Sequence, residues 1–372
     1  MSVARASARV DLGAIRHNAA VLARAAGPAR LMAVVKADGY GHGAVAVARA
    51  ALEGGASSLA VAASAEAAEL RAAGLEAPIL LMGPLAGDEW DAAAEARAEV
   101  VVWTPESVQR AAVAFARRGS RARVHLKLDT GMGRLGARPE GVAALAESAA
   151  AADVDVVGLM THFATADEVA GENAAFMAEQ LVRFRAAAAE LRPRFPGAAV
   201  HAANSAAVLR DPESAFDMVR CGIALYGCSP FGGDPADHDL RPAMSLVSHL
   251  AAIRTVRSRE SVGYGRLWRA LRGTRVGVVP VGYADGYARS LSGRADVLVR
   301  ERRVRVIGAV SMDQITVDLG PGAQETVGDE VVLLGAQGAE LVSAEELAAA
   351  RGSINYEVTC AVGGRIPRVY VG

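Results

Sequence analysis

Cysteine is rare in this chain of 372 residues, which holds only Cys221, Cys228 and Cys360. Their spacing matches neither a zinc site nor a CxxC redox pair. An odd number of cysteines without a secretory signal is typical of a reducing compartment, so we expect free thiols and a cytoplasmic location. The seven histidines form no HExxH motif or other close metal-binding pair, and we therefore expect no metal site.

Long apolar runs and an excess of charge of either sign are also missing. Arg, Glu or Asp interrupts the alanine-rich stretches before they reach the ~18 residues that a membrane span needs. The formal net charge is only −1, whereas nucleic-acid-binding proteins usually carry a basic field. We therefore expect neither a membrane nor a nucleic acid as a partner. Lysine is scarce as well: it occurs only at Lys36 and Lys127, so each lysine is informative.

Alternating patterns, in contrast, are abundant. Hydrophobic residues make up 52% of the chain, which is enough for large cores. In residues 1–235, short apolar runs end in polar residues and are followed by amphipathic, alanine-rich stretches. The eight runs are LMAVVK, SLAVAAS, APILLMG, EVVVWT, RVHLKLD, VDVVGLMTH, AVHAANS and FDMVRCGIALYG. Eight strand-then-helix units predict an α/β fold, a parallel (β/α)8 TIM barrel, over this range.

The composition changes after Pro230, where GGDPADHDLRP has the glycine, proline and aspartate content of a linker. Beyond it, β-rich runs such as MSLVSHLAAIRTV and ADVLVRERRVRVIGAV alternate with turn residues, and only SAEELAAARG has a clear helical pattern. These features predict a second, mostly β domain over residues 236–372.

Polar residues stand at the ends of several predicted barrel strands. They are Lys36, His162, Asn204, Ser205 and Arg220. Chance would scatter such residues over both ends of a barrel, whereas functional groups in this fold gather at the carboxyl ends of the strands. The sequence therefore predicts one site at that rim.

Lys36 directly follows an apolar strand in AVVKADGYGHG. It is either a solvent-facing residue of the barrel mouth or a desolvated amine. Desolvation lowers the pKa of a lysine and makes it nucleophilic, as Schiff-base chemistry requires. The spacing alone leaves both interpretations open, although the glycine-rich turn that follows is able to approach a ligand closely.

The stretch RVHLKLDTGMGRLG places His125, Lys127 and Asp129 on one face of a strand. Both faces of a barrel strand are buried, so this charged face points inward and needs partners. It forms either a purely structural network or a device in which Lys127 holds Arg134 for an anionic ligand. GMGRLG also matches the GxGxxG pattern, but no acid follows the next strand and Pro139 comes early, which disfavours a nicotinamide cofactor.

Two further stretches, HAANSAAVL and RCGIALYG, place small residues directly after a strand. Both suit a phosphate held by backbone N–H groups and the hydroxyl of Ser205. Ordinary helix capping by Asn204 or Ser205 explains the first stretch equally well. Arg220 also has an ordinary alternative, a surface ion pair with Asp217 three positions earlier.

Together these stretches resemble the alanine racemases, barrel enzymes that depend on pyridoxal 5'-phosphate. The similarity runs from VVKADGYGHG to the C-terminal GGRIPRVY and so crosses both predicted domains. The stretches in between are HLKLDTGMGRLG, GLMTHFATAD, HAANS, MVRCGIALYG, VGYGRLW, VGYADGY, GAVSMDQ and INYEV.

The resemblance implies an isomerase that interconverts L-alanine and D-alanine, a precursor of peptidoglycan. The reaction would pass through a pyridoxal phosphate aldimine on Lys36 and use two bases on opposite faces of the substrate. Lys36 would be one base and Tyr264 of the partner subunit the other. The enzyme would therefore be a homodimer with shared active sites.

The resemblance also implies how the cofactor is held. The residues around its phosphate would be Tyr40, Ser205, Gly222, Ile223 and Tyr356. Arg220 would face the pyridine nitrogen, and His162 would lie against the ring and link Arg220 to Tyr264. Asn204 and Tyr283 would line the same site.

The substrate carboxylate would bind to Arg134, which also contacts the phenolic oxygen of the cofactor, and to the backbone near Met312 of the partner subunit. Lys127 would be carbamylated, and the resulting anion would position Arg134 without the repulsion that two cations produce. One departure is visible: Ser311 stands where the family often has cysteine. We expect little effect, because the contact expected from Met312 is made by its backbone.

Three other functions fit a barrel of this kind. A protein that only carries the cofactor needs no second base, and the VGYGRLW stretch argues against it. A basic-amino-acid decarboxylase needs an acid facing the pyridine nitrogen, where the resemblance places Arg220. A racemase of broader specificity often has an export signal, which the N-terminal sequence lacks.

Overall fold

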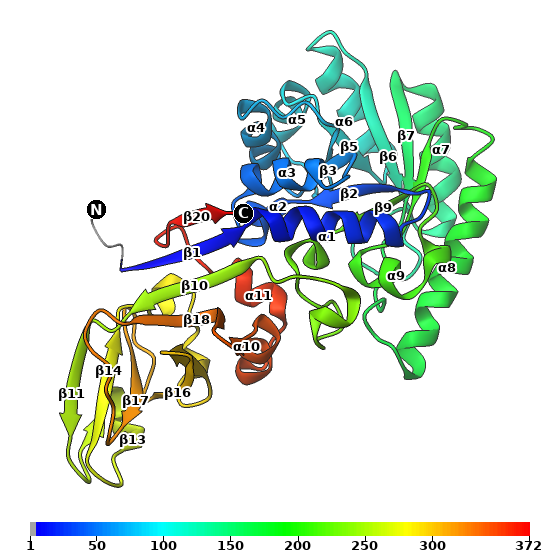
Figure 1. Ribbon diagram of the computed structural model, residues 1–372. Helices are drawn as coiled ribbons and strands as arrows, with labels where there is room; N and C mark the ends of the chain where they lie inside the picture. The colour runs from blue at the N-terminus through cyan, green and yellow to red at the C-terminus, as the bar shows by residue number, and fades with distance from the viewer. Residues whose placement is uncertain (1–4) are drawn as a thin grey trace.

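The computed structural model describes residues 5–372 and divides them into a barrel and a mostly β part (Figure 1). Eight parallel strands close the barrel, which confirms the predicted fold class. These strands are β2 (Arg30–Val34), β3 (Ser58–Val61), β4 (Ile79–Leu81), β5 (Glu99–Val102), β6 (Ala122–Lys127), β7 (Val154–Met160), β8 (Ala199–His201) and β9 (Met218–Cys221). Most of their residues are buried, as expected for parallel strands that are covered on both faces.

Helices surround the barrel strands. They are α1 (Leu12–Ala25), α3 (Ala44–Glu53), α4 (Ser64–Ala72), α5 (Glu89–Glu95), α6 (Pro105–Ala116), α7 (Val142–Ala151), α8 (Gly171–Leu191) and α9 (Ser205–Arg210). Local signals set their starts: at α6, Thr104 accepts a hydrogen bond from the backbone of Ser107 at 3.1 Å, and Pro105 occupies the first turn.

The helix layer differs in one respect from eight strand-then-helix units. After β9 the chain forms only the short 3-10 turn Ile223–Tyr226 and then leaves the barrel. The N-terminal helix α1 packs against α3 and α9 and so fills the gap in the helix layer. The ring is therefore closed by a helix that precedes the first barrel strand in the sequence.

The second part is built on a sheet of ten strands. Its strands are β1 (Ala6–Asp11), β10 (Met244–His249), β11 (Ala252–Val256), β14 (Thr274–Val279), β15 (Asp296–Val299), β16 (Arg302–Ile307), β17 (Ile315–Gly320), β18 (Glu330–Gln337), β19 (Glu340–Val342) and β20 (Arg368–Val371). The short hairpin of β12 (Ser261–Val262) and β13 (Trp268–Arg269) stands apart from this sheet.

The first strand of the chain belongs to this second sheet and not to the barrel. Strand β1 pairs with β10 on one side and with β20 on the other, as Figure 1 shows where the blue and red ends of the ribbon meet. The sequence division at residues 235 and 236 assigns β1 to the barrel domain, because its hydrogen-bonding partners lie more than two hundred positions away. Both ends of the chain thus tie the two parts together.

A second difference concerns the run ADVLVRERRVRVIGAV, which the structure divides into β15 and β16. The turn between them is formed by Arg300 and Glu301, with φ angles of 50° and 60°. Two-residue hairpin turns need positive φ, which sequences usually mark with glycine or asparagine. Neither residue is present here, so the pattern gives no sign of the turn.

Two helices of the C-terminal part, α10 (Ala344–Arg351) and α11 (Asn355–Cys360), lie between the large sheet and the barrel (Figure 1). Helix α11 packs against the short segment α2 (Lys36–Tyr40), which follows the first barrel strand. Residues of the β part therefore reach the carboxyl end of the barrel within one chain. Between residues 5 and 372, no helix has the length and apolar character needed to cross a membrane.

Candidate active site

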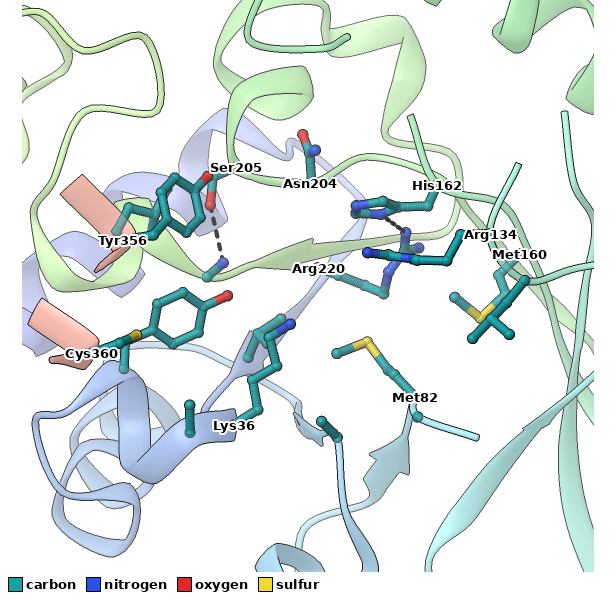
Figure 2. Close-up of a pocket in the computed structure, with 18 of the residues that line it drawn as sticks. Lys36, Met82, Arg134, Met160, His162, Asn204, Ser205, Arg220, Tyr356 and Cys360 are labelled. Atoms are coloured by element: carbon teal, nitrogen blue, oxygen red, sulfur yellow. Dashed lines mark hydrogen bonds between the residues drawn. The ribbon is translucent and has the colours of Figure 1, made fainter. Parts of the chain in front are cut away.

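A cavity of about 570 Å³ opens at the carboxyl ends of the barrel strands. Eleven residues that the sequence singled out line it: Lys36, Tyr40, Lys127, Arg134, His162, Asn204, Ser205, Arg220, Gly222, Ile223 and Tyr356. They come from several strands and from α11, and Figure 2 shows most of them pointing toward one space. The polar groups at the strand ends are thus gathered at one rim.

Lys36 is held at the start of a left-handed turn. Ala37, Asp38, Gly39 and Tyr40 have φ angles of 54°, 51°, 59° and 52°. This conformation costs L-residues roughly 1–2 kcal/mol each, so tertiary contacts must hold the turn in place. We attribute the turn to the packing of α2 between the barrel and α11.

Two buried side chains fasten the ends of this turn. His42 Nδ1 donates to the carbonyls of Gly39 and Tyr40 at 3.1 and 3.0 Å. The hydroxyl of Tyr226 donates to the carbonyl of Val34 at 2.9 Å, two residues before the lysine. Burial lowers the pKa of His42 to about 4, so the ring stays neutral at physiological pH.

Aromatic rings form one wall near the turn. The rings of Tyr40 and Tyr226 stack with centroids 4.8 Å apart, and Tyr356 lies 6.1 Å from Tyr40. Burial raises the pKa values of both Tyr40 and Tyr356, so both phenols are protonated and able to donate hydrogen bonds.

Asn204 and Ser205 have different roles in the structure. Asn204 caps α9 by accepting a hydrogen bond from the backbone of Ala207 at 3.0 Å. Ser205 Oγ instead accepts from the backbone N–H groups of Gly222 and Ala224, at 3.0 and 3.3 Å. The capping role that the sequence left open between two residues therefore belongs to Asn204.

Gly222 keeps the space beside these groups open. A Cβ at this position would collide with the hydroxyl oxygen of Tyr40. The absent side chain leaves room for the hydroxyl of Tyr40, which lines the same cavity as Ser205 and Tyr356. Figure 2 shows Ser205 and Tyr356 side by side. Hydroxyls grouped in this way suit a phosphate or another anion.

Arg220 is buried at the opposite side of the cavity and is held from several directions. Its guanidinium donates to the backbone carbonyls of Thr161 and Ala202 at 2.7 and 2.9 Å. It also donates to His201 Nδ1 at 2.9 Å and contacts His162 Nδ1 at 3.3 Å. Burial lowers its pKa to about 10, which still leaves it charged at neutral pH.

The surface ion pair between Arg220 and Asp217 is not formed, so that alternative is wrong. Asp217 pairs with Arg192 at 3.3 Å and accepts from the backbone of Val200 at 2.8 Å. The two side chains lie on opposite sides of the strand end, because Arg220 points into the barrel and Asp217 points out of it.

Lys127 lies buried beside two arginines. Burial first, and then the charges of Arg220 and Arg134, lower its pKa to about 8. Asp129 does not bond to the lysine: its carboxylate accepts from the backbone N–H groups of Gly131 and Gly133 at 2.9 and 3.1 Å. It thereby shapes the loop that carries Arg134, and Lys127 is left without a counter-ion within bonding distance among the described residues.

His162 is also kept neutral. Burial and the neighbouring charges of Arg220 and Lys127 lower its pKa to about 3. Gln180, which is fully buried, fixes the loop behind it by donating to the carbonyl of His162 at 3.2 Å and accepting from the backbone of Ala164 at 2.8 Å.

Comparisons with known proteins agree along the whole chain. The family model of the alanine racemase N-terminal domain matches residues 10–230, and the model of the C-terminal domain matches residues 243–370. The chain belongs to the alanine racemase family.

The relatives of the family cover nearly the full chain. It is 45% identical to the alanine racemase of Desulforamulus reducens, over 98% of both chains. It is 44% identical to that of Symbiobacterium thermophilum, over 98% of this chain and 97% of the other. The crystal structure of alanine racemase from Streptomyces lavendulae matches with a TM-score of 0.94 and 41% identity, covering 100% of this chain and 98% of the other. This member of the family is therefore an amino-acid racemase, an isomerase.

Three residues that the resemblance assigned to a racemase site lie outside the cavity. Tyr264, Tyr283 and Met312 belong to the β part, and their exposed fractions are 70%, 41% and 53%. Within a single chain they do not join the barrel residues.

Sequence reasoning missed several residues around the racemase cavity. Met82 and Cys360 line it, and His201 and Glu99 lie behind Arg220. Met82 and Cys360 carry no local signal because they resemble ordinary core residues. His201 had a signal, since a histidine at the end of an apolar strand has to point into the barrel or out of it.

Proposed function

We propose that this chain interconverts L-alanine and D-alanine with pyridoxal 5'-phosphate bound in the barrel cavity. The observation that carries the proposal is the convergence of three kinds of group in one space. These are the amine of Lys36, a cluster of hydroxyls around Ser205 and the buried guanidinium of Arg220. The amine and the hydroxyls suit an aromatic phosphate ester that reacts with an amine, and the guanidinium would face the nitrogen of its ring.

The residues present fit such a cofactor. The space left by Gly222 is bordered by the hydroxyls of Tyr40, Ser205 and Tyr356, which would hold the phosphate. Ile223 and Asn204 line the same wall. Arg220 would donate to the pyridine nitrogen, and His162 would lie against the ring. Lys36 would anchor the cofactor covalently through Nζ.

When bound, pyridoxal phosphate withdraws electrons from the α-carbon of an attached amino acid and so acidifies its proton. Racemisation then requires one base on each face of that carbon. Lys36 would remove or return the proton on one face, and Tyr264 of the partner subunit would do so on the other. The usual pKa of tyrosine is about 10, so Tyr264 needs nearby hydrogen-bond donors or positive charge, which His162 and Arg220 would supply.

A homodimer would bring these two bases together. The exposed Tyr264 and Met312 belong to the β part, as do the strongly exposed Leu267 and Leu271. Several large apolar side chains exposed in one part of a protein favour burial against another protein surface. A second copy of the chain is the partner that would complete both sites by symmetry.

Arg134 would bind the substrate carboxylate, and carbamylation of Lys127 would position it. The low pKa of Lys127 leaves a large share of neutral amine near pH 8. Its nitrogen would attack CO2 to form an N–C bond and release one proton to solvent. The product is an anion between two arginines, which replaces repulsion by attraction.

A direct assay tests the proposal. The purified protein with added pyridoxal phosphate should convert L-alanine to D-alanine, measured by a coupled oxidase assay, and the reverse conversion should reach the same equilibrium. Borohydride reduction followed by peptide mapping should place the cofactor on Lys36. The chain has only two lysines, so mapping decides between Lys36 and Lys127. Absence of conversion, or an adduct on Lys127, contradicts the proposal.

A further inference from the structure

A row of buried polar side chains runs from Arg220 through the barrel interior to the amino ends of the strands. Arg220 Nη1 lies 2.9 Å from His201 Nδ1, and His201 Nε2 lies 2.8 Å from His125 Nδ1. His125 Nε2 lies 2.9 Å from Glu99 Oε2. The other oxygen of Glu99, Oε1, accepts a hydrogen bond from Arg123 at 2.7 Å. The side chain of Arg123 is 56% exposed.

The donors in this row all point the same way. A guanidinium only donates, so His201 Nδ1 accepts and the proton of this neutral ring is on Nε2. That proton is donated to His125 Nδ1, which leaves the proton of His125 on Nε2, facing Glu99. Both rings are therefore neutral Nε2–H tautomers, and the row ends on an ionised carboxylate.

The surroundings keep these protonation states. Burial, and then the charge of Arg220, hold the pKa of His201 well below its usual value. Burial raises the pKa of Glu99, but the hydrogen bonds from His125 and Arg123 outweigh it and leave the pKa lowered. A shift of protons along the row would protonate Glu99 and neutralise Arg220, against the lowered pKa of Glu99 and the pKa of about 10 that keeps Arg220 charged.

The local structure makes room for this row. Gly158 of β7 lies between β6 and β8, and a Cβ there would collide with the ring of His125. The pairing of β6 with β7 also shifts register between Val124 and His125. The glycine and the shift together let His125 reach across to His201.

Arg220 needs a counter-charge that its immediate contacts do not provide. In the part of the chain that the structure describes, no carboxylate lies within ion-pairing distance of it. In the unmodified chain its charged neighbours in the cavity are the cationic groups Lys36, Lys127 and Arg134, and His162 is neutral. A carbamate on Lys127 would be shared between Arg220 and Arg134 and would offset the charge of Arg220 only in part. Buried charges are costly unless they are paired and hydrogen-bonded.

We propose that Glu99 is the remote counter-ion of Arg220 and that, through His125 and His201, it sets the positive potential that Arg220 presents to the cofactor ring. Glu99 is then a positioning residue for the racemase, although it lies at the far end of the barrel from the substrate. The link to the ring rests on the proposed function, whereas the orientation of the hydrogen bonds does not.

The first test needs no cofactor. ¹⁵N NMR of histidine-labelled protein should show His201 and His125 as neutral Nε2–H tautomers between pH 6 and 8. Assignment would use the variants His201→Gln and His125→Gln, each of which removes one signal set. A cationic ring or an Nδ1–H tautomer at either position would overturn the proposal, whether or not the protein binds pyridoxal phosphate.

The second test separates charge from structure in the holoenzyme. Glu99→Gln retains a hydrogen-bond acceptor for His125 but removes the negative charge. Arg123→Met retains Glu99 but removes the arginine that pairs with it. The pH midpoint of the visible absorbance of bound pyridoxal phosphate should fall in the first variant and rise in the second. The expected size is about 0.8 pH unit for Glu99→Gln, for a charge roughly 15 Å away at an effective dielectric constant near 20, and less for the exposed arginine.

The opposite signs are the decisive result. A purely structural role for Glu99 predicts no shift, or shifts of the same sign, and either outcome would overturn the proposal. Ser58→Ala is the matched control, since Ser58 is a buried polar residue of β3 outside the row, and its midpoint should not move. If wild-type protein shows no visible band at all, the proposed function fails, while the tautomer measurement still decides the orientation of the row.

Discussion

The barrel and the β part differ in how deeply they bury the residues of the site. In the barrel, Arg220, Lys127 and Ser205 are buried around one cavity, and hydrogen bonds hold Arg220 and Ser205 in place. In the β part, Tyr264 and Met312 lie on the surface with more than half of their area exposed. The barrel half of the site is thus prepared within one chain, whereas the other half is presented outward. This contrast fits the proposed homodimer, in which each chain would prepare one cavity and complete the cavity of its partner.

The largest effect is expected from removing the amine of the barrel. Lys36→Ala should lower alanine racemisation by more than about 10⁴-fold, because it removes both the covalent anchor and one base. The same variant should lose the borohydride-trapped adduct. Lys127→Ala is the control, since it removes the only other lysine and should keep the adduct.

The comparison itself is tested by mixing subunits. Tyr264→Phe should lower activity by roughly 10²–10⁴-fold, as loss of a general base does. If the site is shared, a mixture of Lys36→Ala and Tyr264→Phe chains should regain activity under subunit exchange. Random pairing of a symmetric dimer makes half of the dimers hybrids with one intact site in two, which gives about a quarter of wild-type activity.

A matched mixture controls for this result. Lys36→Ala and Arg134→Ala both lie in the barrel, so every hybrid site keeps a defect and no activity should return. No recovery in the first mixture, despite hybrid formation, would show that the barrel and the β part of one chain build the site together. Recovery in the matched mixture would show instead that Lys36 and Arg134 of one site come from different chains.

The sign of the charge that residue 220 presents to the barrel cavity gives a third test. Arg220→Glu should lower racemisation by about 100-fold, because a carboxylate favours a protonated cofactor ring and a longer-lived carbanion. Pyruvate from side transamination should then rise, and a new visible absorbance band should appear with alanine present. Normal racemisation without that band would mean that Arg220 does not face the ring nitrogen.

Lys127 should have a smaller effect. Lys127→Ala should lower kcat/KM by about 10-fold, and acetate or chloropropionate should restore part of the loss by replacing the carbamate. In the wild type, uptake of ¹³CO2 at Lys127 requires the neutral amine, so labelling should rise as pH increases through about 8. Mass spectrometry and ¹³C NMR measure both points, and an unmodified amine in active enzyme would contradict this role.

The smallest effect concerns stability in acid. The buried His42 and His162 have pKa values lowered to about 4 and about 3, so the unfolded chain binds more protons below pH 6.5 than the folded one. Their contribution to the free energy of unfolding is therefore complete above pH 6.5 and is lost as the pH falls toward 4. Hydrogen exchange should show the barrel opening before the β sheet, whose described strands hold only the partly exposed His249.

His42→Gln isolates one of these contributions. An amide retains a donor for the two carbonyls of the turn but does not titrate, so the variant should lose less stability between pH 6.5 and 4. The difference should be about 1 kcal/mol per pH unit, the linkage expected for one group. A pH dependence identical to that of the wild type would mean that His42 is not buried as a neutral ring.

The sequence patterns alone predicted the barrel, its rim and the polar residues at the strand ends. Eight apolar runs with polar ends suffice for this, because parallel strands place all of their carboxyl ends on one side. The resemblance to the family was needed for Tyr40, Gly222, Ile223 and Tyr356. The alternation of side chains along RVHLKLD likewise turned His125 and Lys127 inward. These are local regularities, and they are readable without knowing which segments touch.

Features that depend on distant contacts could be read only from the folded structure. In it, Asn204 caps α9, and Ser205 accepts a hydrogen bond from Gly222. Arg220 bonds to His201 and not to Asp217, and β1 belongs to the β sheet. The hydrogen bonds of these groups cross from one strand or one part of the molecule to another, and no local pattern specifies which partner is nearest. The exposure of Tyr264 is of the same kind, since burial depends on what the rest of the chain leaves uncovered.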